Sequence, residues 1–598
     1  MMENNRQDLH PMGATPLEEG VLFRVWAPNA AGVAVVGSFN DWNGESHPMH
    51  AEPDGNWVIA VRAATVGAEY KFQITTDQGS FLRIDPYARE LTSSVGNAVV
   101  HDPGYDWQDS EFFAAEPGEL VIYELHVGTF SCDPGDADAG QFAAVAKRLP
   151  YLKALGINAI QLMPVAEFAG ERSWGYNPAH PFSVERSYGG SLEFKRLVSH
   201  AHALGIAVLL DVVYNHLGPS DLDLWQFDGW SENGMGGIYF YNDFRAMTPW
   251  GQTRPDYGRE EVRRYIGDNV LMWFRDYHVD GLRFDCTQYI RTLRGTEDAD
   301  LPNGWSLLQD IHRDISTFFP GRLTIAEDLQ NNSSLVLGVS AGGAGFDAQW
   351  DGNFVHPVRR AAIGQWDDQR CLSDVAAAVA FSYNDNPFSR VIYSESHDEV
   401  ANGSARVPQE VDPENPGSWR AQKRSTLAAA LVLTSPGIPM LFQGQELLLG
   451  GWFDDSAPVD WSQSDSAAGI TSLYRDLILL RRGFGGLTRG LGGQHTHVHH
   501  CNEGGKVLAF HRWADGGPGD DVVVVANFSC EELTNYGVGF PAEGPWQVRW
   551  NSDDSAYNGD FSNRGSQGAV AYPGPCDAMP CHGEVSVAPY SVLVLSQG

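Results

Sequence analysis

The chain has few cationic side chains for its length. Its 598 residues include 40 lysines and arginines against 76 aspartates and glutamates, which gives a formal net charge of −36. A protein that follows the phosphates of a nucleic acid needs clustered cations, and so does one that binds an anionic membrane surface. The charge balance therefore argues against nucleic acid and membrane as partners. It leaves a neutral ligand such as a sugar compatible.

Long apolar runs and closely spaced cysteines are also missing. No uninterrupted apolar stretch approaches the roughly 20 residues that span a bilayer. The polar segment Met1–Pro11 lacks the basic and apolar regions of a secretory signal. The seven cysteines are scattered, without the spacing of a metal-binding knuckle. These features predict reduced thiols and a cytoplasmic location.

The spacing of apolar residues divides the chain into three regions. Between about Gly20 and Val100, short alternating runs separated by turn residues indicate a small β-sandwich, and we place this N-terminal domain at residues 1–110. After Gly483–Gly493 the strand pattern returns, which predicts an antiparallel β-domain over residues 491–598.

Between these regions, buried-type strand runs alternate with amphipathic helical stretches. This alternation predicts an α/β fold, an eight-stranded TIM barrel over residues 111–490. Residues 217–257 are too many for a simple loop and are rich in Gly, Trp, Asp and Tyr, so we expect an excursion beside a binding cleft. The expected strands are Leu120–Leu125, Ala159–Val165, Ala207–Val213, Gly281–Asp285, Leu323–Asp328, Gly345–Trp350, Val391–Glu395 and Pro439–Gln443. The expected helices include Gln141–Leu155, Ser191–Leu204, Glu260–Tyr277, Trp305–Phe319 and Arg420–Thr434.

Acidic residues follow four of the expected strands at their carboxyl ends, where the active sites of such barrels gather. These strand ends are Asp211–His216, Arg283–Asp285, Ala326–Asp328 and Ser396–Glu399. A single acid in this position could cap a helix. Acids at four strand ends on one rim, together with two histidines and an arginine, instead predict a catalytic site.

Convergent carboxyls without a cysteine nucleophile or a cofactor loop favour the cleavage of an acetal. A retaining reaction needs an ionised carboxylate that attacks the anomeric carbon and a protonated carboxyl about 5–5.5 Å away. Arg283 lies two residues before Asp285, on the same face of the strand, and favours the ionised form of that carboxyl. We therefore expect Asp285 as the nucleophile and Glu327 as the acid/base. Asp398, next to His397, would bind sugar hydroxyls and help to distort the ring.

The four segments Asp211–His216, Gly281–Asp285, Ala326–Asp328 and Glu395–Asp398 resemble the signature regions of the alpha-amylase family, in order and on the expected strands. The resemblance implies that Asp285 is the nucleophile, Glu327 the general acid/base and Asp398 the transition-state stabiliser. It also implies a subsite for the attacked glucose, with an aromatic platform at Tyr176. The residues lining that subsite would be Tyr176, Asp211, His216, Arg283 and His397.

Shorter segments are similar to particular groups of that family. Phe39–Trp42 resembles the N-terminal carbohydrate-binding sandwich of branching and debranching enzymes, and Ser396–Val400 and Phe442–Glu446 resemble signatures of glycogen-branching enzymes. Tyr123–Phe130 and Thr248–Gly251 are instead similar to maltooligosyltrehalose trehalohydrolase.

The resemblance implies an alpha-glucan substrate, whether glycogen, amylose or maltooligosaccharides. It favours a branching transglycosylase that cleaves alpha-1,4 links and forms alpha-1,6 branches through a covalent glucosyl-Asp intermediate. A hydrolase of the trehalohydrolase, amylase or debranching type is the alternative. Cys286 follows the expected nucleophile, where Ala is commoner, and we interpret it as a small buried thiol.

We expect no metal and no cofactor. The segment Gln494–Cys501 contains metal-type ligands but alternates like an exposed polar strand, far in sequence from the acids. Asn215 matches a calcium ligand of some amylases, yet one oxygen cannot make a site that needs roughly six to eight ligands. No phosphate-cradling loop is present.

Overall fold

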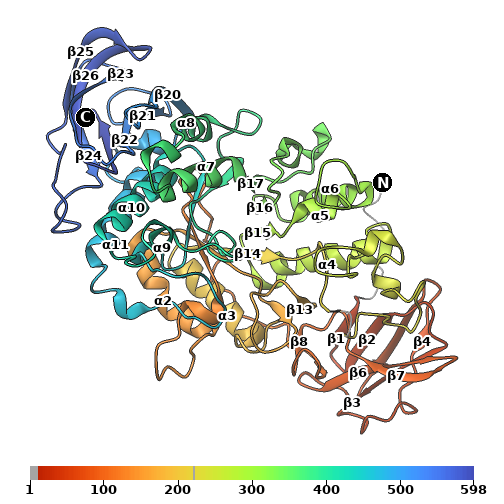
Figure 1. Ribbon diagram of the computed structural model, residues 1–598. Helices are drawn as coiled ribbons and strands as arrows, with labels where there is room; N and C mark the ends of the chain where they lie inside the picture. The colour runs from red at the N-terminus through yellow and green to blue at the C-terminus, as the bar shows by residue number, and fades with distance from the viewer. Residues whose placement is uncertain (1–10, 220–221) are drawn as a thin grey trace.

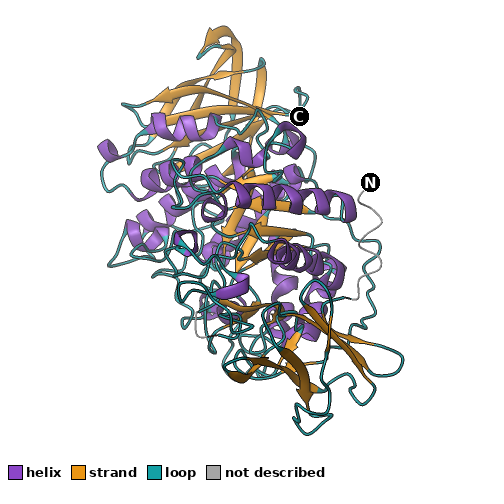
Figure 2. Cartoon of the chain, turned by 90° about the vertical axis from the view of Figure 1, so that its right-hand side faces the viewer, coloured by secondary structure: helices purple, strands orange, loops and turns teal. Residues whose placement is uncertain are grey.

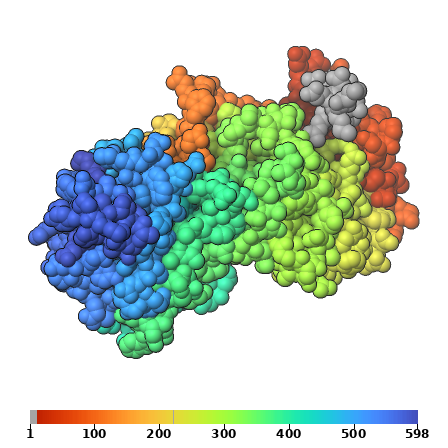
Figure 3. All heavy atoms as spheres, turned by 90° about the horizontal axis from the view of Figure 1, so that it is seen from above, coloured from red at the N-terminus to blue at the C-terminus, as the bar shows by residue number. Residues whose placement is uncertain are grey.

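The computed structural model describes residues 11–219 and 222–598, so the first ten residues, on which the expected lack of a signal rests, lie outside it. The molecule is elongated, and the barrel separates two β-rich ends (Figure 1). The N-terminal strands form one end and the C-terminal strands the other. Figure 3 shows the C-terminal end as a blue lobe.

The N-terminal region is a β-sandwich, as the alternating pattern predicted. In β6 the buried residues Tyr70, Phe72 and Ile74 alternate with less buried neighbours, so one face of the strand enters the core. One sheet has the order β1-β2-β5-β4, and the other has the order β3-β6-β9-β8, with β7 paired to β6. The strands are β1 (Gly13–Pro16), β2 (Val21–Trp26), β3 (Gly32–Gly37), β4 (His50–Ala51), β5 (Asn56–Val61), β6 (Glu69–Thr76), β7 (Gly79–Arg83), β8 (Glu90–Leu91) and β9 (Ala98–Val99).

The central region is a closed eight-stranded barrel in which every neighbouring pair is parallel. This confirms the predicted TIM barrel, and all eight expected strands are present, seven of them shorter than expected and β19 shifted by one residue. Nearly all strand residues are buried, which explains their continuous apolar runs. The strands are β10 (Ile122–Leu125), β11 (Ala159–Leu162), β14 (Ala207–Val212), β15 (Gly281–Phe284), β16 (Leu323–Ala326), β17 (Ala348–Trp350), β18 (Arg390–Ile392) and β19 (Ile438–Phe442).

Helices surround the barrel strands (Figure 2). The helix predicted over Glu260–Tyr277 has those bounds in the structure, and α10 begins where the Ser418 hydroxyl accepts a hydrogen bond from the Ala421 N–H. Among residues 11–219 and 222–598, no helix is both long and apolar enough to cross a membrane. The helices are α1 (Val127–Phe130), α2 (Phe142–Leu155), α3 (Gly190–Ala203), α4 (Glu260–Tyr277), α5 (Thr287–Arg291), α6 (Pro302–Phe318), α7 (Gly352–Ile363), α8 (Leu372–Ala380), α9 (Val407–Val411), α10 (Trp419–Thr434) and α11 (Ala468–Arg481).

Two insertions enlarge the carboxyl-terminal end of the barrel. A hairpin of β12 (Ala166–Phe168) and β13 (Pro178–Val184), absent from the predicted elements, follows β11. The long segment after β14 contains the short 3₁₀ helices η2 (Gly237–Tyr239) and η3 (Phe244–Ala246). It also contacts the sandwich, because Asp228 accepts hydrogen bonds from the backbone and side chain of Asn29, both at 2.9 Å.

The C-terminal region is antiparallel, as predicted, with the sheet order β20-β21-β22-β27-β24-β25-β26-β23. The histidine-rich segment forms β20 and pairs with β21. All seven cysteines are free thiols. The strands are β20 (His495–Asn502), β21 (Val507–Trp513), β22 (Val522–Asn527), β23 (Leu533–Phe540), β24 (Gly544–Asn551), β25 (Ala569–Cys576), β26 (Met579–Val587) and β27 (Ser591–Ser596).

Candidate active site

A buried arginine joins three carboxylates at or just after the carboxyl ends of three barrel strands. Arg283 Nη1 lies 2.6 Å from Asp211 Oδ2 and 3.0 Å from Asp285 Oδ1, and its Nη2 lies 3.0 Å from Glu327 Oε2. The guanidinium is fully buried and packs over the Trp350 ring at 4.3 Å. Three of the acids that the sequence placed on one rim, Asp211, Asp285 and Glu327, therefore meet around a single cation.

Asp285 and Glu327 lie close enough to act on one bond. One oxygen of Asp285 lies within 4.8 Å of an oxygen of Glu327. This spacing matches retaining glycosidases, because inverting enzymes need roughly 6.5–9.5 Å to admit a water. Asn215 Nδ2 also donates to Asp285 Oδ2 at 3.0 Å, which fixes the carboxylate plane. The backbone N–H of Cys286, the second residue after β15, donates a hydrogen bond to Glu327 Oε2 at 2.7 Å.

Burial sets the proton affinities of both acids. It raises the pKa of Glu327 to about 7, and Asp285 adds to the rise while Arg283 opposes it. Burial also raises the pKa of Asp285 to about 6, with Arg283 opposing. The sequence led us to expect that Arg283 would decide the state of Asp285. Burial outweighs the arginine, which is shared among three carboxylates.

His397 and Asp398 follow β18, and both interact electrostatically with Asp285. His397 Nε2 is 3.5 Å from Asp398 Oδ2, and its ring stacks on Tyr176 with centroids 5.1 Å apart. Burial would lower the pKa of His397, but the charges of Asp398 and Glu124 raise it to about 9. Asp398 is the most open of the predicted acids, with 43% of its side chain exposed.

The remaining predicted residues form the wall beside the acids. The Tyr176 hydroxyl donates to Asp211 Oδ2 at 2.7 Å, and His216 Nε2 lies 2.8 Å from the Tyr176 carbonyl oxygen. Burial lowers the pKa of His216 to about 4, so this ring is neutral. Within the described chain, Asp211 Oδ1, Asn215 Oδ1 and His216 Nδ1 are buried without a protein partner. Unpaired buried polar atoms of this kind suit a ligand rich in hydroxyl groups.

Sequence reasoning missed two residues of the site. Glu124, on β10, binds His397 through Oε1 at 2.7 Å and is fully buried. It lies near the carboxyl end of the first barrel strand, so the rule that found the other acids could have found it. Trp250, in the long segment after β14, stacks on His216 with centroids 4.7 Å apart. Its approach to His216 depends on a loop path that no local pattern records.

One cluster of metal-type ligands occurs in the described residues, and it coincides with the two acids. Atoms of Asp285, Cys286 and Glu327 lie within 4.8 Å of one another. Arg283 already contacts both carboxylates and supplies the positive charge there. The histidines of β20 are not part of such a cluster among residues 11–219 and 222–598.

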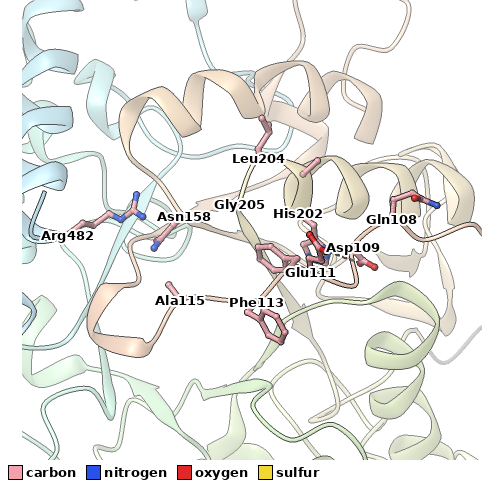
Figure 4. Close-up of a pocket in the computed structure, with 12 residues that line it drawn as sticks. Gln108, Asp109, Glu111, Phe113, Ala115, Asn158, His202, Leu204, Gly205 and Arg482 are labelled. Atoms are coloured by element: carbon pink, nitrogen blue, oxygen red, sulfur yellow. Dashed lines mark hydrogen bonds and ion pairs between the residues drawn. The ribbon is translucent and has the colours of Figure 1, made fainter.

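A cavity of about 510 Å³ lies at the opposite end of the barrel and is not this site. Its lining includes Asn158 and Gly205, which precede the amino ends of β11 and β14. Figure 4 shows Phe113, Asp109 and His202 on one side of it and Asn158 and Arg482 on the other. The acids lie at the carboxyl ends of the strands, so the chemistry belongs to the other rim.

A parallel barrel with two carboxyls this close at its carboxyl-terminal rim has the arrangement that retaining enzymes acting on glycosidic bonds use. A family model described as the alpha amylase catalytic domain matches residues 128–226 and 222–476. Residues 11–88 match carbohydrate-binding module 48, the isoamylase N-terminal domain, and residues 497–598 match the alpha amylase C-terminal all-beta domain. The chain belongs to the alpha-amylase family and is an enzyme of that family.

Curated relatives resemble nearly the whole chain. The 1,4-alpha-glucan branching enzyme GlgB of Corynebacterium jeikeium (strain K411) is 31% identical over 586 residues, which cover 92% of this chain and 78% of the relative. The 1,4-alpha-glucan branching enzyme GlgB of Kitasatospora aureofaciens is 32% identical over 592 residues, with coverage of 92% and 74%.

Solved structures share the fold. A pullulanase from Anoxybacillus sp. LM18-11, crystallised with maltotetraose, superposes with a TM-score of 0.76 at 22% identity and covers 98% of this chain and 87% of its own. Pullulanase type I from Bacillus subtilis str. 168, crystallised with maltose, gives a TM-score of 0.77 at 22% identity, with coverage of 98% and 85%. At this identity the likeness concerns the fold alone.

Proposed function

We propose that this enzyme is a 1,4-alpha-glucan branching enzyme that retains the anomeric configuration. The observation that carries the proposal is the close approach of Asp285 and Glu327, with oxygens within 4.8 Å, around one buried arginine. This spacing suits a carboxylate that attacks the anomeric carbon and an acid that protonates the departing oxygen. The names of the curated relatives favour transfer to another glucan.

In the first step, Asp285 attacks the anomeric carbon of an alpha-1,4-linked glucosyl unit while Glu327 gives its proton to the departing O4. The glycosidic bond breaks and a glucosyl ester of Asp285 forms. In the second step, Glu327 takes the proton of an acceptor 6-hydroxyl, whose oxygen attacks the same carbon and releases Asp285. An alpha-1,6 branch results, with no net consumption of water.

The neighbouring residues support these two steps. Arg283 contacts both carboxyls and balances the negative charge near Asp285. Asp398, beside His397, faces the same site and is proposed to bind sugar hydroxyls as the ring distorts. Tyr176 is proposed as the aromatic platform for the pyranose, because an aromatic face suits the apolar face of a sugar.

Hydrolysis is the second candidate. It is favoured by the Thr248–Gly251 segment, which resembles trehalohydrolases and whose Trp250 ring stacks on His216 in the site. Incubation with amylose separates the two reactions. A branching enzyme lowers iodine staining without releasing reducing ends, and treatment of the product with a debranching enzyme then yields short linear chains. Reducing ends that rise in step with the loss of staining would establish a hydrolase instead. Asp285→Asn, which cannot form the ester, should abolish either activity, whereas Asp465→Asn, at an exposed position, should not.

A further inference from the structure

We propose that Glu124 is a positioning residue that holds His397 as a cation against the glucosyl subsite. The inference rests on the proposed function, because it assigns His397 a charged role toward the sugar at that same site. It concerns a residue of the first barrel strand, which the signature segments of the sequence do not include.

A single buried carboxylate binds His397 at two points. Glu124 Oε1 lies 2.7 Å from His397 Nδ1, and Glu124 Oε2 accepts the His397 backbone N–H at 3.0 Å. Both side chains are buried, with at most 1% exposed. A carboxylate accepts hydrogen bonds only, so Nδ1 carries a proton, and Nε2 is the ring nitrogen that faces Asp398 and the site.

Aromatic rings hold the imidazole in its plane. Tyr176 stacks on one side at 5.1 Å and 22°, Trp350 packs at 5.8 Å and 56°, and the Trp174 ring meets His397 edge-on at 5.9 Å. With the ring fixed by these neighbours, its orientation does not depend on Glu124 alone. What Glu124 adds is charge, which an uncharged side chain of the same shape would not supply.

The charges that face His397 come from several elements. Asp398 on its own loop and Glu124 on β10 favour the imidazolium, whereas Arg283 on β15 disfavours it. Asp211 and Asp285 also interact with the ring, and its charge opposes the rise that burial gives to their pKa values. Burial would lower the pKa of His397, and the two neighbouring carboxylates raise it to about 9.

The neighbouring His126 shows what the pocket does to a histidine without such a carboxylate. Burial lowers the pKa of His126 to about 4, and the charge of His397 adds to the fall. The His126 ring bonds only to neutral partners, which are the hydroxyls of Thr129 and Tyr188 and the carbonyl oxygen of Ser173. Asp398 also raises the pKa of His397, but it is 43% exposed and 3.5 Å away, whereas Glu124 is fully buried and adds a hydrogen bond of 2.7 Å to its charge. Without the Glu124 charge, His397 would therefore lose its proton near neutral pH.

The charge matters for the substrate, because an imidazolium donates a charge-assisted hydrogen bond from Nε2. A neutral ring that keeps its proton on Nδ1 would present Nε2 as an acceptor instead. Glu124 thus decides whether His397 donates to a sugar hydroxyl or accepts from it. It also places a positive charge beside the anionic Asp285 and Asp398.

The test is the titration of His397 in the full-length protein, followed by NMR of ring-labelled histidine and assigned with a His397→Gln variant. In the unaltered protein the midpoint should lie above pH 8, and in Glu124→Gln it should fall to about pH 7 or below. Glu124→Asp, which keeps the charge, should move it less. A matched control is Gln161→Leu, since Gln161 is buried opposite Glu124 on β11 and should leave the titration unchanged.

Glucan turnover provides the second readout. The loss of kcat/KM in Glu124→Gln should grow as the pH rises from about 5.5 to 7.5, because His397 then loses its proton in the variant only. A loss that is the same at every pH would mean a merely structural role and would overturn the proposal. A His397 midpoint near 6.5 in the unaltered protein would overturn it as well, even if Glu124→Gln does not fold. Because the NMR titration needs no substrate, a failure of the proposed function would be visible separately as absent glucan turnover.

Discussion

The backbone N–H of Cys286 donates a hydrogen bond to Glu327 Oε2 at 2.7 Å. The residue after the proposed nucleophile thus orients the proposed acid. Cys286 has a φ of 41°, in the left-handed region, which is unfavourable for a residue other than glycine. Residues with such strained backbone conformations cluster at functional sites. Phe284 and Ala326, the last residues of β15 and β16, are also register partners. The spacing of the two carboxyls is therefore built by the backbone of adjacent strands.

Replacing the proposed acid should separate substrates by their leaving groups. Glu327→Gln cannot donate a proton, so turnover of amylose should fall by about two to four orders of magnitude, the range of general acid catalysis. A maltosyl fluoride, whose leaving group needs no proton, should still react at a measurable rate. Equal losses on both substrates, in parallel initial-rate assays, would remove Glu327 from the role of acid.

The activity should depend on pH through the same pair. Asp285 must be ionised and its pKa is raised to about 6, while Glu327 must be protonated and its pKa is raised to about 7. Activity is therefore lost as the pH falls below 6, where Asp285 gains a proton, and as it rises above 7, where Glu327 loses one. A profile of kcat/KM should peak between these values, with apparent limits that belong to the pair. A plateau extending to pH 9 would contradict this assignment.

Trp250 should contribute to glucan binding. Its ring stacks on His216 at an angle of 9°, yet 45% of the residue stays exposed beside the site. Trp250→Ala should raise the KM for maltooligosaccharides about tenfold, which corresponds to about 1.4 kcal/mol, and Trp250→Phe should raise it less. Trp366→Ala is the matched control, because Trp366 is also exposed but follows the carboxyl end of α7. Equal KM values for the Trp250 and Trp366 variants would show that Trp250 is not part of a subsite.

A buried ion pair fastens the C-terminal region to the barrel. Lys423 Nζ, on α10, lies 2.6 Å from Asp553 Oδ1 and 2.5 Å from the Ser591 hydroxyl, and the pair is almost completely buried. Lys423→Met leaves the buried Asp553 carboxylate without its cation and should lower the free energy of unfolding by about 3–5 kcal/mol.

The double variant Lys423→Met/Asp553→Asn, which removes both charges, should recover part of that stability. Denaturant unfolding of the three proteins measures both effects. A cost below about 1 kcal/mol for Lys423→Met, within the range of surface pairs, would mean that the pair does not hold the two regions together.

The fold could be predicted largely from local patterns. Strands such as Ala207–Val212 are buried on both faces and therefore appear in the sequence as a continuous apolar run. The run predicts the strand, and the polar residues at its end mark the barrel rim. The β12–β13 hairpin escaped, because its strands are short and inserted within one βα connection.

Parts of the site depend on contacts that no local pattern records. Glu124 and His397 are 273 positions apart, and only the closure of the barrel brings them together. The proton affinity of Asp285 depends on burial, whose extent follows from packing by distant segments. The sequence could name the cation beside Asp285, but it could not show that Arg283 is shared with Asp211 and Glu327.

The most direct test of the central claim is to trap the glucosyl enzyme. A fluorinated maltosyl fluoride that forms the ester faster than it is resolved loses its anomeric fluoride. It should add the mass of one fluorinated maltosyl group to the peptide that contains Asp285, as read by mass spectrometry. The same treatment of Asp285→Asn should leave that peptide unmodified. A label on any other residue, or consumption of the reagent with inversion and no label, would contradict Asp285 as the nucleophile facing Glu327.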